Sequence, residues 1–287
     1  MARGRRVRSG IATAMVYLAL AISLVPLGFI LGKILVEGLP AISWSFFTEL
    51  PPADPYSTGG IKNALVGTLI LMGIATAVAA PIGIMTALFI NDAARSRGAG
   101  LRRAGAAVGF IVDVLLGMPS IVAGIVIYLA LVVAMGHFSA LAGGIALGLI
   151  MFPIVVRASD EILRLVPDAQ KEAALALGAP RWRTTWSVVL PAAAPGLLTG
   201  VMLALARASG ETAPLLFTSL SNQFFSTDIM QPIAALPQLI FANSINVQTP
   251  QSLELAWGAA LVLVAIVLIL NLAARIIAAR VRPLEGR

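Results

Sequence analysis

Cysteine is absent from the 287-residue chain, and histidine occurs once, at His137. The first absence excludes disulfides and metal sites with cysteine ligands, and the second excludes a metal site built from several histidines. Charged residues are also scarce, because Asp, Glu, Lys and Arg together make up 11% of the chain. Soluble domains usually carry about 25%, so a water-soluble globular domain of this length is excluded.

What the chain has instead is apolar sequence, with 59% hydrophobic residues and a mean hydropathy of +0.95. The apolar runs are continuous, which favours membrane-spanning helices over the alternating strands of a β-barrel. Crossing the hydrocarbon core takes about 20 residues. The sequence therefore predicts an all-α integral membrane protein with six spans, at residues 11–32, 64–90, 114–136, 139–157, 190–211 and 255–279.

Basic residues test this order of spans, because cytoplasmic connections carry an excess of Lys and Arg. They gather in four places: before the first span, at 91–105, at 157–189 and near the C-terminus. Outside these places the basic residues are Lys33, Lys62 and Arg207. Since every second connection is basic, both termini are predicted to be cytoplasmic. The net charge of +7 is then explained by anchoring at the membrane, and no nucleic-acid partner is expected.

One predicted cytoplasmic segment, between the fourth and fifth spans, has a distinctive spacing. Pro167 and Asp168 predict the start of a short helix, and Gly178 followed by Pro180 predicts its end. From composition alone this segment is an amphipathic connector. Its full pattern is Glu172-Ala173-Ala174, three residues, Gly178, then nine residues to Val188-x-Leu190-Pro191.

This pattern resembles the EAA loop of ABC-importer permeases, although Val188 stands where the family usually has Ile. The resemblance implies that the segment is a coupling helix, which docks into a groove on a cytoplasmic ATPase. By the same resemblance, the residues that make this contact are Glu172, Ala173, Ala174 and Gly178.

Three further segments indicate which group of ABC-importer permeases the chain resembles. They are residues 59–68 (GGIKNALVGT), 117–124 (GMPSIVAG) and 206–218 (ARASGETAPLLFT). Together they are similar to the PstA-type permease subunits of bacterial high-affinity phosphate ABC transporters, from about residue 59 to the C-terminus. The resemblance implies a type I ABC-importer permease bundle. It divides the chain into residues 1–58, with the tail, first span and an outer loop, and a permease core at 59–287 with a coupling loop at about 157–189.

The resemblance also implies partners and a location. The expected complex lies in the bacterial inner membrane and holds a homologous PstC-type permease, two PstB-type ATPase subunits and a PstS-type phosphate-binding protein. ATP and Mg²⁺ are expected in the ATPase subunits, because this chain has no GxxxxGK[ST] motif. The chain itself is expected to be a non-catalytic pathway subunit, without a cofactor and surrounded by membrane lipid.

Arg207 is notable because a charge within a span is costly in lipid and usually faces a cavity or an opposite charge. Glu211 follows four residues later, which on a continuous helix puts both side chains on one face. In one interpretation Arg207 donates forked hydrogen bonds to phosphate, with Ser209 and Thr212 as neutral donors. In the other interpretation Arg207 and Glu211 form a structural latch within the bundle.

Two other charged positions border the predicted spans. Arg157, beside Asp160 and Glu161, falls at the cytoplasmic mouth of the fourth span, where it either gates the exit or anchors the helix end. Asp113 is predicted to lie at the cytoplasmic boundary, because residues 114–136 alone are long enough to span. Ser120, directly after Pro119, either lines the pathway or serves helix packing, and packing is the favoured assignment.

Other functions remain open from the residues alone. A permease for another oxyanion, such as molybdate, sulfate or phosphonate, or the paired phosphate permease would share the loop and the bundle. A stand-alone secondary transporter would make the EAA-type loop a coincidence. An intramembrane enzyme is disfavoured, because the chain has no Cys, one His and no acid pair at the middle of a predicted span.

Overall fold

The computed structural model describes residues 2–54, 56–57, 59–245, 247 and 249–281. Over these residues the chain is helical without a strand, apart from an isolated bridge between Leu220 and Ile233. The helices are α1 (Ala2–Gly38), α2 (Trp44–Thr48), α3 (Lys62–Ala94), α4 (Ala99–Leu116), α5 (Ser120–Ile127), α6 (Val133–Met135), α7 (Ala140–Leu165), α8 (Asp168–Ala176), α9 (Arg181–Thr184), α10 (Leu190–Ala208), α11 (Ala213–Thr218), α12 (Leu236–Ile245) and α13 (Pro250–Val281).

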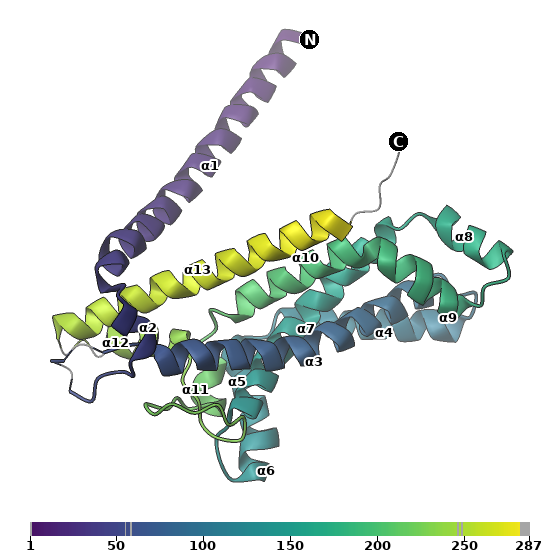
Figure 1. Ribbon diagram of the computed structural model, residues 1–287. Helices are drawn as coiled ribbons and strands as arrows, with labels where there is room; N and C mark the ends of the chain where they lie inside the picture. Colours follow the sequence, from purple (N-terminus) through teal and green to yellow (C-terminus); the bar gives the residue numbers. More distant parts are fainter. Residues whose placement is uncertain (1, 55, 58, 246, 248, 282–287) are drawn as a thin grey trace.

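The centre of the bundle is the pair α3 and α7, which pack closely along their length. Small residues make this approach possible, as is usual between helices in lipid. A Cβ added at Gly144 would lie 2.5 Å from Ile74, and one added at Gly83 would lie 2.7 Å from Val155. Helix α10 packs on α7 and also contacts α3, and α13 packs on α10 and α12 (Figure 1). The core of the bundle is therefore built on two helices that share a close interface.

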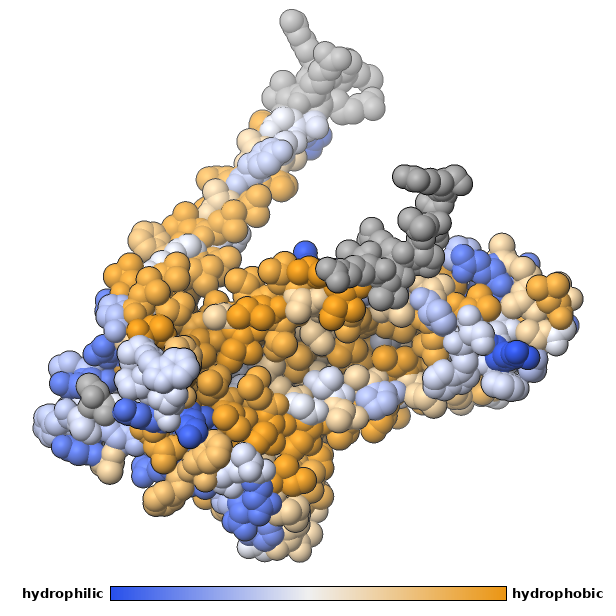
Figure 2. All heavy atoms as spheres, viewed as in Figure 1, coloured by the Kyte–Doolittle hydropathy of each residue, from blue (hydrophilic) through white to orange (hydrophobic). Residues whose placement is uncertain are grey.

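The predicted membrane architecture is confirmed. Five helical stretches are long and apolar enough to span, and a bent pair of helices supplies a sixth candidate; the five are Arg8–Ala41, Lys62–Ala94, Ala140–Leu165, Arg181–Ala208 and Pro250–Ile277. Hydrophobic side chains cover the middle of the bundle, and hydrophilic ones collect toward its two ends (Figure 2). The end of α3, the start of α4 and the helices α8 and α9 lie at one of these ends (Figure 1). The basic segments 91–105 and 157–189 therefore share that end.

The third predicted span is wrong in its boundaries. Helices α4 and α5 meet at 105° across the break at residues 117–119, so 114–136 is not one helix. Pro119 has no N–H to continue the helix and disfavours helical backbone at the residue before it. The N–H of Met118 closes α4 by donating to the carbonyl of Leu115 at 3.2 Å. Asp113 consequently lies within α4, one turn before the break, and the argument that placed it at the membrane boundary does not hold.

Helix α1 stands apart from the rest of the bundle (Figure 1). None of the residues in its most apolar window is buried, and it meets α13 near its C-terminal end. There Gly38 lies so close to α13 that an added Cβ would be 2.8 Å from the carbonyl oxygen of Trp257. The apolar surface of α1 is thus left for lipid or for another membrane subunit.

The contact between α3 and the segment before α12 gives a test of the packing. A Cβ added at Gly67 would lie 2.0 Å from the carbonyl oxygen of Ala234. We expect Gly67→Ala to destabilise the bundle by about 1–3 kcal/mol, the usual cost of overpacking, measured as a lower melting temperature of the purified protein in detergent. Gly73→Ala, on the same helix with no atom within 4 Å of the added Cβ, is the matched control. Equal melting temperatures for the two variants would contradict this contact.

Candidate functional site

The break between α4 and α5 opens a pocket of about 220 Å³. Its walls are the residues of the break, one face of α7 and the end of α10, and its polar side chains belong to Ser120, Arg207 and Glu211. A water molecule occupies about 30 Å³ in the liquid, so the pocket has room for a small anion. Broken helices at membrane depth are tolerated where they line such a cavity, because their free backbone groups need polar partners.

Arg207 and Glu211 both line the pocket, but the geometry predicted for them is wrong. Helix α10 ends at Ala208, and the chain turns over Ser209 and Gly210, so the two side chains do not share one continuous helix face. Among the described residues, no ion pair within 4.0 Å joins Arg207 to Glu211. The cation and the carboxylate therefore line one pocket without the ion pair that the latch interpretation requires.

The two predicted hydroxyl donors lie outside the pocket lining. Ser209 is buried, and its hydroxyl donates to the carbonyl of Ala206 at 2.8 Å. The hydroxyl of Thr212 donates to the carbonyl of Pro237 at 3.4 Å. Ser120, which the sequence assigned to packing, instead lines the pocket beside Pro119. Its position directly after the break is the signal that could have identified it.

Arg157 lies within α7 rather than at its end, because α7 continues to Leu165 and the predicted fourth span stops too early. Its Nε donates to Oδ1 of Asp113 at 2.8 Å, and its Nη2 donates to the carbonyl of Gly109 at 2.8 Å. Asp113 and Gly109 belong to α4, so Arg157 fastens α4 to α7. The side chains of Arg157 and Asp113 are 29% and 57% exposed. Charges this exposed within apolar helices require water or protein beside them, which marks this face as one turned away from lipid.

The predicted short helix after α7 is confirmed as α8, which buries none of its residues. It ends in a Schellman motif around Gly178, whose φ is +85°. The N–H of Gly178 donates to the carbonyl of Leu175 at 2.9 Å, and that of Ala179 donates to Ala174 at 3.2 Å. Leu177 follows the helix and is 89% exposed. The EAA-type segment therefore presents an open, partly apolar surface at the end of the bundle.

The start of α8 is held to the bundle by charge. Asp168, its first residue, pairs with Arg95 at the end of α3 and lies 3.8 Å from the ammonium of Lys171. Burial, and then repulsion from Arg95, lower the pKa of Lys171 below its ordinary value. Of the predicted contact residues, Glu172 and Ala173 are exposed and Ala174 is half-buried. These contacts leave one side of α8 anchored and the other side open.

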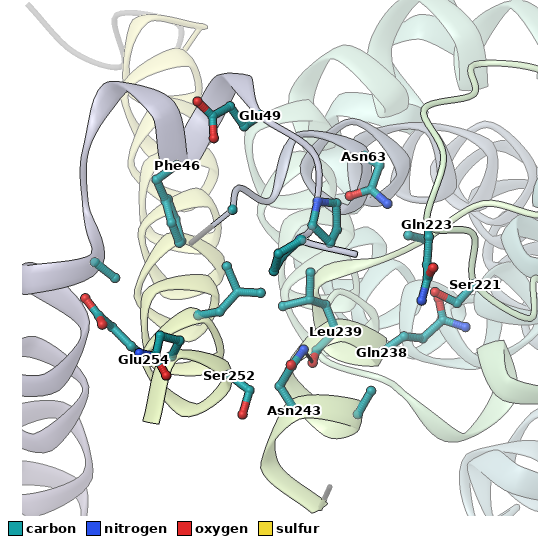
Figure 3. Close-up of a pocket in the computed structure, with 18 of the residues that line it drawn as sticks. Phe46, Glu49, Asn63, Ser221, Gln223, Gln238, Leu239, Asn243, Ser252 and Glu254 are labelled. Atoms are coloured by element: carbon teal, nitrogen blue, oxygen red, sulfur yellow. Dashed lines mark hydrogen bonds between the residues drawn. The ribbon is translucent and has the colours of Figure 1, made fainter. Parts of the chain in front are cut away.

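A second, larger pocket of about 720 Å³ lies at the opposite end of the bundle, between the segment after α1, α12 and the start of α13 (Figure 3). Figure 3 shows Glu254 on one side of it and Gln223 and Gln238 on the other. Gln238 is buried and donates to the carbonyl of Leu215 at 3.1 Å. This pocket was not predicted; the Gln and Asn side chains in the long connection before α13 are the signal for it.

Comparison with known proteins identifies the class. Residues 101–283 match the family described as binding-protein-dependent transport system inner membrane component. Among solved structures, a chain of the MetNI methionine ABC transporter, described as inward facing, superposes with a TM-score of 0.60. The match covers 76% of this chain and 96% of that one at 18% identity, so it bears on the fold alone. The fold and family together define a multi-pass permease component of an ABC importer.

Curated relatives narrow the class further. The phosphate transport system permease protein PstA of Yersinia pestis is 42% identical over 277 residues, covering 96% of this chain and 92% of that protein. PstA of Haemophilus influenzae is 40% identical, with 95% and 94% covered, and PstA 1 of Mycobacterium tuberculosis strain H37Rv is 37% identical, with 95% and 88% covered. The chain belongs to the PstA family of inner-membrane permeases.

The left-handed backbone at Gly178 gives a test of the α8 terminus. We expect Gly178→Ala to destabilise the terminus by roughly 1–2 kcal/mol, the cost of left-handed backbone for a residue with a Cβ. Hydrogen exchange at residues 177–179, followed by mass spectrometry, should then be faster. Gly178→Asn is the control, because Asn tolerates this conformation better. Equal exchange in Gly178→Ala and the parent protein would contradict the motif.

Proposed function

We propose that this chain is a membrane subunit of an ATP-driven importer for inorganic phosphate. The observation that carries the proposal is the Arg207 pocket at the break between α4 and α5, in a chain whose relatives are PstA proteins. A guanidinium offers a planar fork of donors that matches two oxygens of a tetrahedral oxyanion. The Ser120 hydroxyl adds a neutral donor to the pocket.

The absence of an ion pair between Arg207 and Glu211 supports this role, because an arginine already neutralised would attract an anion weakly. The small size of this pocket also suits transport, since a transported ion must bind and then leave. In this proposal residues 59–287 form the permease core, and Arg207, Glu211 and Arg157 lie along the phosphate pathway. Ser209 and Thr212 support the chain after α10 through their bonds to backbone carbonyls and do not donate to phosphate.

Coupling to ATP belongs to α8. Its open side carries Glu172 and Ala173, and its anchored side is tied to α3 through Asp168 and Arg95. A push on α8 is thereby transmitted to two of the spanning helices, α3 and α7. The proposed partners are a PstC-type permease, two PstB-type ATPases that bind ATP and Mg²⁺, and a PstS-type phosphate-binding protein. This chain is the non-catalytic component, and its termini are cytoplasmic in this arrangement.

Uptake of radiolabelled phosphate at low concentration tests the proposal, in cells lacking this gene. We expect the parent gene to restore uptake, and Arg207→Gln and Glu172→Lys to reduce it at least about tenfold, within the usual range of coupling free energies. Arg102→Gln, on the exposed start of α4, is the matched control and should leave uptake unchanged. Membrane abundance of each variant is measured by immunoblot. If the parent gene restores uptake of sulfate or molybdate and leaves phosphate uptake unchanged, the substrate is another oxyanion.

Crosslinking tests the coupling surface separately. The chain has no cysteine, so Glu172→Cys introduces one thiol into this subunit at the open side of α8. We expect this thiol to crosslink to the ATPase in a nucleotide-dependent way, because ATP closure moves the partner against α8. Leu129→Cys, on an exposed part of the chain between α5 and α6, is the control. The coupling role is excluded if position 172 never crosslinks to the ATPase under any nucleotide condition.

A further inference from the structure

Helix α4 is attached to the bundle through a narrow contact. Its buried residues are Gly105, Gly109 and Val112, and most of its remaining surface is exposed. The glycines bring α4 close to its neighbours but supply no side chains to interlock with them. At Gly109 an added Cβ would meet only the guanidinium of Arg157, at 3.7 Å. Arg157 is consequently a principal side-chain contact between α4 and α7.

The Arg157 side chain grips α4 at two points at once. Its Nε and Nη2 atoms engage the Asp113 carboxylate, and Nη2 also donates to the Gly109 carbonyl at 2.8 Å. This combination of a charged and a backbone acceptor fixes both the height and the rotation of α4 against α7. Charge-assisted bonds of this kind are stronger than neutral ones.

A second carboxylate, that of Asp160, lies near the Nη1 atom of Arg157. Asp160 lies on α7 itself and is only 3% exposed. Its Oδ2 is 2.8 Å from Nη2 of Arg164 and 3.9 Å from Nη1 of Arg157. Its Oδ1 is buried and has no hydrogen-bond partner among the described residues. A buried carboxylate oxygen without a partner is costly, so Asp160 has the capacity to accept Arg157.

These groups lie between the pocket and α8. Asp113 precedes Gly117, a pocket residue, by one turn of α4, and Arg157 follows Pro153, another pocket residue, by one turn of α7. Helix α7 then runs eight residues further to Leu165, and two residues join it to α8. The contact between Arg157 and α4 thus lies along α7 between the pocket and α8, so a movement of α8 passes it on the way to the pocket.

We propose that Arg157 exchanges between Asp113 and Asp160 during transport, and thereby pins or releases α4 next to the pocket. In the pinned state, seen here, Arg157 holds α4 and Asp160 keeps one oxygen unpaired. In the released state Arg157 bonds to Oδ1 of Asp160, and α4 is free to tilt about the break at 117–119. This inference rests on the proposed transport function and assigns positioning roles to Asp113 and Asp160.

The exchange keeps Arg157 paired throughout. Asp113 loses its partner on release, but its side chain is 57% exposed, so water beside it replaces the lost bonds. Asp160 is buried, and its pairing improves on release. Since each state satisfies one carboxylate better than the other, the two states can lie close in free energy, which a switch requires.

Two variants should act in opposite directions. In the reconstituted complex, Asp113→Asn removes the pinned state, and we expect ATP hydrolysis without the phosphate-binding protein to rise about fivefold or more, the lower limit of typical allosteric coupling. Asp160→Asn removes the released state, so hydrolysis and phosphate uptake should both fall by a similar factor. Glu161→Gln, the exposed neighbour of Asp160, is the control and should change neither rate.

A distance measurement gives a readout that needs no substrate. Phe110→Cys on α4 and Leu165→Cys on α7 place spin labels at exposed positions in a chain that otherwise has no cysteine. In this background, Asp113→Asn should shift and broaden the distance distribution between the labels, and Asp160→Asn should narrow it. The exchange is overturned if neither variant alters the distance distribution of the parent and both change ATP hydrolysis in the same direction. The ion pairs would then be static supports.

A more conservative variant, Arg157→Lys, serves as the test if the Asp113→Asn or Asp160→Asn complex does not assemble. Arg157→Lys keeps the charge but replaces the planar fork with one ammonium nitrogen, which cannot reproduce the contacts of Nε and Nη2 with the Asp113 carboxylate, so it should raise basal hydrolysis as Asp113→Asn does. Unchanged hydrolysis in a stably assembled Arg157→Lys complex would overturn the exchange. Failure of the proposed function is distinguishable from failure of the exchange. If only the proposed function fails, the parent complex takes up no phosphate, but the distances between the labels still respond to the variants.

Discussion

A chain that crosses lipid must satisfy its backbone N–H and C=O groups within its own helices, because the hydrocarbon offers no partners. This constraint makes the break between α4 and α5 informative. The helix stops at residues 117–119 with apolar sequence on both sides, so the freed backbone groups have to face a polar space. The pocket there receives Arg207 from the last turn of α10 and Glu211 from the turn that follows it. One interrupted span therefore determines where charge can be placed inside the bundle.

Helix α7 connects the parts of the molecule that function requires. Near its middle, Pro153 and Ile154 form a wall of the pocket. One turn later Arg157 grips α4, and the helix ends at Leu165, two residues before α8 begins. Its other face packs on α3, whose last turn is tied back to α8 through Arg95. The pocket and the ion pairs thus share one helix, and the coupling surface on α8 begins two residues after it, so a displacement of α8 has a short structural route to the pocket.

The sequence predicted what depends on local signals. Continuous apolar runs predicted the helical membrane fold, and Asp168 and Gly178 predicted the two ends of α8. It failed where the outcome depends on tertiary packing or on a short interruption. Residues 114–136 carry no charge and are mostly apolar, so the sequence predicts one span there and does not reveal the bend at Pro119. The pairing of Asp113 with Arg157 joins residues 44 positions apart, and no periodicity within either helix indicates it.

The ion pairs around Arg157 also constrain how this sequence can change over evolutionary time. Asp113, Arg157, Asp160 and Arg164 form a chain of alternating charge within apolar surroundings. Asp160 is the buried member, and loss of Arg164, whose guanidinium lies 2.8 Å from it, leaves a poorly compensated buried charge, which typically costs about 3–5 kcal/mol. Loss of Arg164 alone therefore passes through a damaged intermediate, whereas loss of Asp160 and Arg164 together does not. Asp160 and Arg164 are therefore expected to covary among related sequences, while the exposed Asp113 is freer to change.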